Sequence, residues 1–103
     1  MDLGDVTIEG ITPFIGTIFE VPLDNGATTT LKLESALPYE VRQRRQRYQP
    51  KRTPFSMYFL GDPALILPQG MYALRSEALT LENIFIVPIG QDAQATEYEA
   101  IFT

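Results

Sequence analysis

The chain has 103 residues, of which 45% are hydrophobic and 20% charged, and this composition is typical of one small globular domain with a single core. It contains neither histidine nor cysteine, which excludes disulfides, thiolate chemistry and any catalytic site built on an imidazole base. The formal net charge is −5, yet residues 42–52 hold six basic and no acidic residues, whereas the rest of the chain holds two basic and thirteen acidic residues.

The N-terminal segment "MDLGDVTIEG" is acidic and has no apolar run, so we expect no signal peptide. No stretch of the chain approaches the roughly 20 apolar residues that a membrane-spanning helix needs. These features predict a cytoplasmic location, or a place in a released particle or extracellular assembly, without membrane contact.

The following segment, "ITPFIG", predicts a short helical turn. Thr12 is its expected cap, Pro13 suits the first helical position, and Gly16 is expected to end the turn. Phe14 and Ile15 would then plug one end of a β core.

A hydrophobic period of two predicts a β-hairpin over residues 17–34. Its turn signal is Asn25-Gly26, a pair in which both residues are expected to accept a positive φ. The residues expected to point inward are Phe19, Val21, Leu23, Leu31 and Leu33.

Four further strands complete the prediction. Pro88 is expected to end the pairing of the third of them, near residues 79–87, or to mark an edge or bulge there. They are expected near residues 55–60, 71–75, 79–87 and 97–103. Short strands separated by tight turns indicate a single all-β domain over residues 1–103. Its expected architecture is a small antiparallel β-sandwich or partly open barrel of six or seven strands.

Two of the predicted strands are apolar on both faces. In "PFSMYFL" the second face carries Tyr58 and Leu60, and in "NIFIVPI" it carries Phe85 and Val87. One face of a sheet in a two-layer domain usually meets water, so this second face is expected to be covered by other parts of the chain or by a partner. Tyr58 and Leu60 are therefore predicted partner-contact residues.

Oxygen-bearing side chains near the C-terminus are candidates for chemistry. Glu97 and Glu99 share one face of a strand, which is typical of an ordinary solvated side. Asp92, Gln94 and Thr96 offer oxygens for Ca²⁺ but lack the spacing and charge density of a calcium loop. We therefore expect a non-enzymatic protein, with no catalytic residues, no metal, no cofactor and no small-molecule substrate.

The basic segment is expected to form a loop or short helix over residues 38–52, with Pro38 at the first helical position. Three interpretations stay open: a solvated connection, a set of arginine clamps on an acidic surface of a neighbouring subunit, or an arm that binds nucleic acid. The acidic body argues against the third, because it repels phosphate. The predicted partner-binding residues are Arg42, Arg44, Arg45, Arg47, Tyr48, Lys51 and Arg52.

Several strand and turn motifs together resemble a small bacterial family of unknown function. The motifs are "FIGTIFEV" (14–21), "PFSMYF" (54–59), "LPQGMYAL" (67–74), "IFIVPIG" (84–90) and "YEAIF" (98–102). The resemblance implies genes that lie beside phage-tail-collar proteins of the microcystin-dependent type, and it implies no catalytic residues. In that family the connection before "PFS" is usually shorter and less basic, so the arginine-rich segment is a departure from it.

These observations together predict a non-enzymatic structural or interaction protein. The expected partners are copies of the same chain or a tail-like or fibre-like protein. The alternative function is a nucleic-acid-binding module that uses residues 42–52.

Overall fold

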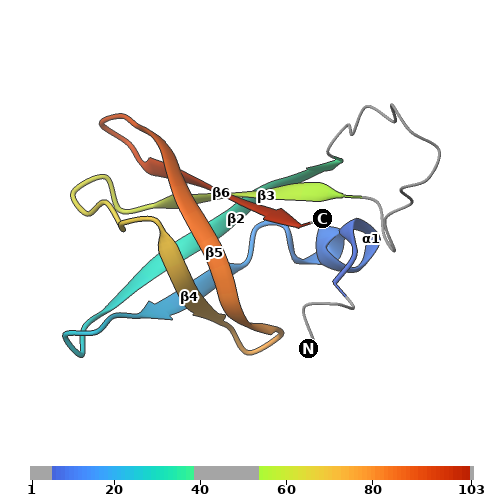
Figure 1. Cartoon of the computed structure of the whole chain (residues 1–103), viewed down its shortest axis with the longest axis horizontal. Helices are drawn as coiled ribbons and strands as arrows, with labels where there is room; N and C mark the ends of the chain where they lie inside the picture. Colours follow the sequence, from blue (N-terminus) through green and yellow to red (C-terminus); the bar gives the residue numbers. More distant parts are fainter. Residues whose placement is uncertain (1–5, 39–53, 103) are drawn as a thin grey trace.

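The computed structural model describes residues 6–38 and 54–102. Within these ranges the chain forms a short helix, a 3-10 turn and six β-strands (Figure 1). The elements are α1 (Ile8–Ile11), η2 (Thr12–Phe14), β1 (Ile18–Pro22), β2 (Thr28–Pro38), β3 (Phe55–Gly61), β4 (Gly70–Arg75), β5 (Thr80–Gln91) and β6 (Thr96–Phe102).

The six strands close into an antiparallel barrel in the order β1-β2-β3-β6-β5-β4. Two three-stranded meanders, β1-β2-β3 and β4-β5-β6, meet at β3–β6 and again at β1–β4. The second junction is narrow, because Glu20 and Arg75 form the one pair of residues that joins β1 to β4. The all-β prediction is confirmed, but the strands form a closed barrel in place of the expected sandwich or partly open barrel, because β1 pairs with β4.

The predicted β1–β2 hairpin is confirmed, and its turn differs from the expectation in one respect. The backbone N–H of Gly26 donates to the carbonyl of Leu23 at 3.1 Å, and the N–H of Leu23 donates to the carbonyl of Ala27 at 2.9 Å. Gly26 has a φ of +83°, whereas Asn25 keeps a negative φ. The loop therefore has the geometry of a type I turn followed by a left-handed glycine, which needs only one residue with a positive φ.

Bulges interrupt three of the ladders. The β4–β5 register shifts between Tyr72 and Leu74, beside Asn83, whose φ is +59°. The β5–β6 register shifts between Pro88 and Gly90, so Pro88 marks a bulge, and β5 continues to Gln91 instead of ending at residue 87. Such bulges increase the local bending of a strand, which a small closed barrel requires.

The barrel interior is filled by one hydrophobic cluster to which every strand contributes. The rings of Phe19 and Phe59 pack edge to face with centroids 6.3 Å apart, and those of Phe55 and Phe102 stack at 5.1 Å. Of the predicted inward residues of the hairpin, four are fully buried and Leu23 is half-buried. The period-two pattern thus placed the core of this hairpin correctly.

The N-terminal turn covers one end of the barrel (Figure 1). Thr7 caps α1, because its hydroxyl accepts the N–H of Gly10 at 3.1 Å. The predicted turn is η2, where Thr12 is the first residue and not the expected cap, since its hydroxyl donates to the carbonyl of Ile8 at 2.6 Å. Ile11 is 1% exposed and belongs to the core, and Phe14 packs against this core as predicted. The prediction for Ile15 was wrong, since its side chain is 43% exposed.

Residues 62–69 carry the chain from one meander to the other, and side chains of the second meander hold this segment. The hydroxyl of Thr96 donates to the carbonyl of Asp62 at 3.1 Å, and the amide of Gln91 donates to the carbonyl of Pro63. The hydroxyl of Tyr72 donates to the carbonyl of Pro68 at 2.6 Å. The segment therefore packs on the barrel through several carbonyl groups that no strand pairing satisfies.

Candidate interaction surface

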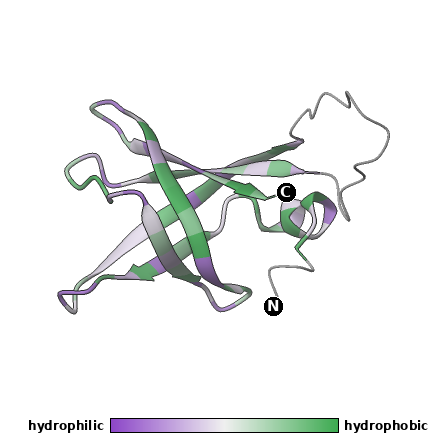
Figure 2. Ribbon diagram, in the orientation of Figure 1, coloured by the Kyte–Doolittle hydropathy of each residue, from purple (hydrophilic) through white to green (hydrophobic). Residues whose placement is uncertain are grey.

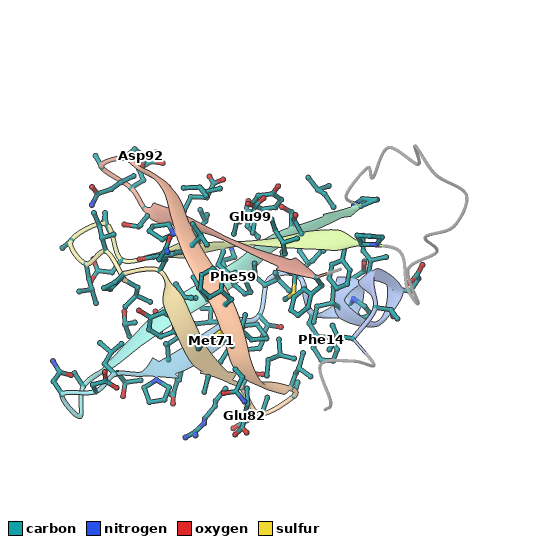
Figure 3. All side chains as sticks on the ribbon, viewed as in Figure 1. Phe14, Phe59, Met71, Glu82, Asp92 and Glu99 are labelled. Atoms are coloured by element: carbon teal, nitrogen blue, oxygen red, sulfur yellow. The ribbon has the colours of Figure 1, made fainter. Side chains whose placement is uncertain are left out.

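Tyr58 and Leu60, the two predicted contact residues inside the described ranges, lie half-buried on the outer face of β3. This face continues onto both neighbouring strands, because Tyr58 lies opposite Ser35 of β2 and opposite Glu99 of β6. Glu99 points away from the barrel interior, which is occupied by Phe59 (Figure 3). The prediction that the second face of this strand is apolar holds for these two residues, but the strands beside it add carboxylates.

A shallow groove of about 270 Å³ runs over this outer face, and we call it the outer groove. Lys32 of β2 and Glu97 of β6 lie on either side of Leu60, so one positive charge lies close to the groove. The lining residues are Glu34, Ser35, Leu37, Tyr58, Leu60 and Glu97. The groove therefore combines apolar side chains, one aromatic ring and several carboxylates.

Tyr58 is the electrostatic centre of the outer groove. Its hydroxyl group donates a hydrogen bond to the Glu99 carboxylate, and this bond raises the pKa of Tyr58 above its ordinary value. Partial burial and the negative charges of Glu99 and Glu97 raise the pKa further, while a hydrogen bond with Ser56 opposes the shift. The ring of Tyr58 thus lies beside the carboxylate of Glu99 and near that of Glu97.

The remaining seven predicted partner-binding residues, Arg42 to Arg52, lie outside the described ranges. One expectation next to them was wrong, because Pro38 is the last residue of β2, where it lies opposite Phe55, and not the first residue of a helix. The two strands that flank the basic segment in the sequence, β2 and β3, are also two of the three strands that form the outer groove.

A second outer surface, the β4–β5 patch, consists of Leu65, Ile66, Met71 and Phe85. Met71 of β4 lies directly opposite Phe85 of β5, and their side chains are 58% and 50% exposed. Leu65 and Ile66 line a neighbouring groove of about 490 Å³ together with Met71. Figure 2 shows the hydrophobic colouring along the middle of β5.

The oxygen-bearing residues near the C-terminus do not converge. The Asp92 carboxylate accepts the backbone N–H groups of Gln94 and Ala95 at 2.8 and 2.9 Å, and these bonds lower the pKa of Asp92. Thr96 is buried and directs its hydroxyl to Asp62. Within residues 6–38 and 54–102, no group of three or more acidic side chains has the geometry of a metal site. Nor does this part of the chain contain a helix that is long and apolar enough to cross a membrane.

Sequence reasoning missed Glu34, Leu37 and Met71 as surface residues of interest. Met71 was detectable, because it lies three positions before the buried Leu74 on the same strand and therefore faces the opposite side. Alternation with Leu33 places Glu34 on the outer face, but its position beside Tyr58 and Glu97 depends on the pairing of distant strands, which no local pattern specifies.

These features define a small antiparallel β-barrel domain with two candidate contact surfaces on its outside. The chain belongs to the family described as Domain of unknown function (DUF6916), whose model matches residues 6–102. That match agrees with the resemblance to a small family of unknown function. Among curated proteins and solved structures, none matches this chain.

Proposed function

We propose that the protein is a non-enzymatic structural or interaction protein, a subunit or accessory of a tail-like or other multimeric assembly. The observation that carries this proposal is the β4–β5 patch, where Met71 and Phe85 lie opposite each other and are each at least half exposed. A contiguous apolar patch on the outside of a protein marks a surface that a partner can cover, and the direct pairing of Met71 with Phe85 supports such a patch here.

The energy available from this patch is consistent with a role in subunit contacts. Burying a whole methionine or phenylalanine side chain stabilises a complex by about 1.5–3 kcal/mol, and these two side chains are already partly buried. Association costs about 4–15 kcal/mol in lost translational and rotational freedom, so a stable contact needs further groups. Leu65 and Ile66 supply such groups, because their apolar side chains are 38% and 49% exposed.

The family resemblance supports the tail-like setting. It implies genes that lie beside phage-tail-collar proteins, and a neighbour of that kind is a component of an extended particle. The protein would then act inside the cell during assembly and outside it as part of a released particle.

The alternative, a nucleic-acid-binding module, has less support from the described residues. They carry ten acidic and two basic residues, which gives a net charge of −8. A surface of this sign repels the phosphate backbone, so nucleic-acid binding would depend on residues 42–52 alone.

The test is the state of association of a Met71→Lys/Phe85→Lys variant, measured by light scattering over a range of protein concentrations. We expect the wild type to form assemblies and the variant to dissociate, because two lysines on the patch cannot be buried without a partner charge. The matched control is Thr28→Lys/Thr30→Lys, which adds the same charge at two exposed positions of β2.

The proposal requires that the control variant still assembles. A wild type that stays monomeric at every concentration, and forms no particle visible by electron microscopy, would contradict it.

A further inference from the structure

The outer groove has the chemistry of an arginine acceptor. Its floor contains the ring of Tyr58 and the side chain of Leu60, and Glu34 and Glu97 line it. Glu99 lies beside the same ring and accepts the hydrogen bond of the Tyr58 hydroxyl. A guanidinium group can stack on an aromatic ring while it bonds carboxylates in pairs, and the methylene stem of arginine packs on apolar side chains.

The charge of this face favours a cationic occupant. Three carboxylates, those of Glu34, Glu97 and Glu99, face the groove or its edge, and Lys32 is the one cation that the strand register places beside them. The whole described part of the chain carries −8, so the surroundings of the groove add to its negative potential.

The chain itself contains the matching ligand. Residues 42–52 hold five arginines and one lysine without an acidic residue among them. In the sequence these residues lie between β2, which ends at Pro38, and β3, which begins at Phe55, and these two strands form most of the groove.

We propose that the outer groove binds arginine side chains from residues 42–52 of a second copy of this chain. Each copy carries both a strongly negative barrel and a strongly positive segment, so the same contact can repeat from copy to copy. Such a head-to-tail contact generates rings or filaments through side chains and does not require strands of two copies to pair. This inference rests on the proposed function and names the partner of one of its two surfaces.

Arginine is the expected ligand in preference to lysine. A guanidinium group offers a planar fork of N–H donors and a face that stacks on Tyr58, whereas an ammonium group is a compact, strongly hydrated charge. The groove should therefore distinguish two peptides that differ only in this side chain.

The direct test uses a synthetic peptide of residues 41–52 and the full-length protein with Arg42, Arg44, Arg45 and Arg47 changed to Gln, so that its own segment does not compete. Titration calorimetry and amide chemical shifts are the readouts. We expect binding with shifts at Ser35, Tyr58 and Glu99, and an affinity loss of at least about ten-fold when every arginine of the peptide is replaced by lysine.

The groove variant is Glu34→Gln/Glu97→Gln/Glu99→Gln, and its matched control is Glu9→Gln/Glu77→Gln/Glu82→Gln, which removes three exposed carboxylates elsewhere. The groove variant should weaken peptide binding at least about ten-fold, and the control should stay within about two-fold, because truncating one side of a hydrogen-bonded charge pair costs far more than removing a distant charge. Equal losses in both variants would overturn the proposal, since they would reflect net charge alone.

A charge exchange identifies the source of the ligand. One variant carries Arg42, Arg44, Arg45 and Arg47 changed to Glu, and the other carries Glu34, Glu97 and Glu99 changed to Lys. Each alone should associate at least about ten-fold more weakly than the wild type, and a mixture of the two should associate again, because each reversed segment meets a reversed groove on the other chain.

A mixture that stays dissociated would overturn the proposal and would indicate that the segment contacts its own barrel or none. Binding of a single-stranded oligonucleotide at physiological salt by the wild type, unchanged in the groove variant and lost in the segment variant, would also overturn it. Neither outcome affects the β4–β5 patch, whose Met71→Lys/Phe85→Lys variant tests the proposed function separately.

Discussion

The hydroxyl group of Tyr98, on β6, accepts a hydrogen bond from the backbone N–H of Leu67 at 2.8 Å. It also donates to the carbonyl of Leu65 at 3.3 Å, and the tyrosine side chain is 1% exposed. One buried side chain of the second meander therefore holds the segment that connects the two meanders.

Replacing Tyr98 with Phe should lower the free energy of unfolding by about 1–3 kcal/mol, because the N–H of Leu67 would lose its buried partner. Urea denaturation measures this loss, and hydrogen exchange at Leu67 should accelerate with it. The control is Tyr72→Phe, whose hydroxyl bonds Pro68 at an exposed position where water can replace it. Equal losses in the two variants would contradict this account.

Truncating an interior phenylalanine should lower the stability of the fold far more than truncating an exterior one. Phe59 is fully buried against Phe19, so Phe59→Ala should cost about 3–5 kcal/mol in stability through lost packing and a cavity. Phe85 is half exposed, and Phe85→Ala should cost less than about 1 kcal/mol in the isolated chain. Thermal or urea denaturation of dilute protein separates the two, and a large loss for Phe85→Ala would show that the patch is structural.

Gly61 lies where a side chain has little room. A Cβ atom there would lie 2.8 Å from Cδ2 of Leu31 and 3.2 Å from the ring of Tyr98, so Gly61→Ala should destabilise the fold by about 1–3 kcal/mol. Gly90→Ala is the control, because a Cβ at Gly90 meets no atom within 4 Å and its φ is not positive. Two variants with the same melting temperature would refute the steric argument.

Asp92 should contribute to stability in a pH-dependent way. Its pKa is lowered by the N–H groups of Gln94 and Ala95, so its contribution is present above the pKa of the unfolded chain and is lost as the pH falls through the folded pKa. The stability difference between wild type and Asp92→Asn should therefore shrink as the pH falls below about 4. Denaturation midpoints at several pH values measure this, and a difference that is independent of pH would disprove it.

The Tyr58–Glu99 hydrogen bond predicts an effect at alkaline pH, on the ionisation of Tyr58. Since this bond raises the pKa of Tyr58, Glu99→Gln should allow Tyr58 to ionise at a lower pH, which NMR of ring-labelled tyrosine can follow. In the wild type the raised pKa contributes stability that is fully present below about pH 10 and is lost as the pH rises through the folded pKa. An unchanged titration of Tyr58 in Glu99→Gln would show that Glu99 is not its partner in solution.

Parts of the fold were predictable because they depend on neighbours in the chain. The positions of Phe19 and Val21 on either side of Glu20, and the alternation of Leu31 and Leu33 with polar residues, were enough to place one hairpin and its inner face. The inner face of β5 was harder to predict. Leu81 and Ile84 are both buried although three positions separate them, and simple alternation would place them on opposite faces. An extra residue at a bulge beside Asn83 brings both to the inner face. Asparagine tolerates a positive φ, so that signal was present in the sequence but weak.

The sequence by itself determined the all-β class, the approximate strand positions and the absence of histidine and cysteine chemistry, because composition, alternation and turn residues act locally. Only the tertiary structure decided that the barrel closes, since closure depends on Glu20 meeting Arg75, 55 positions later. It also decided which surfaces form: Glu34 joins Glu97 around Tyr58, and Met71 meets Phe85, through strand pairings and bulges that no local pattern specifies. Register between distant strands is set by the summed packing of the whole core, and for that reason a short motif does not predict it.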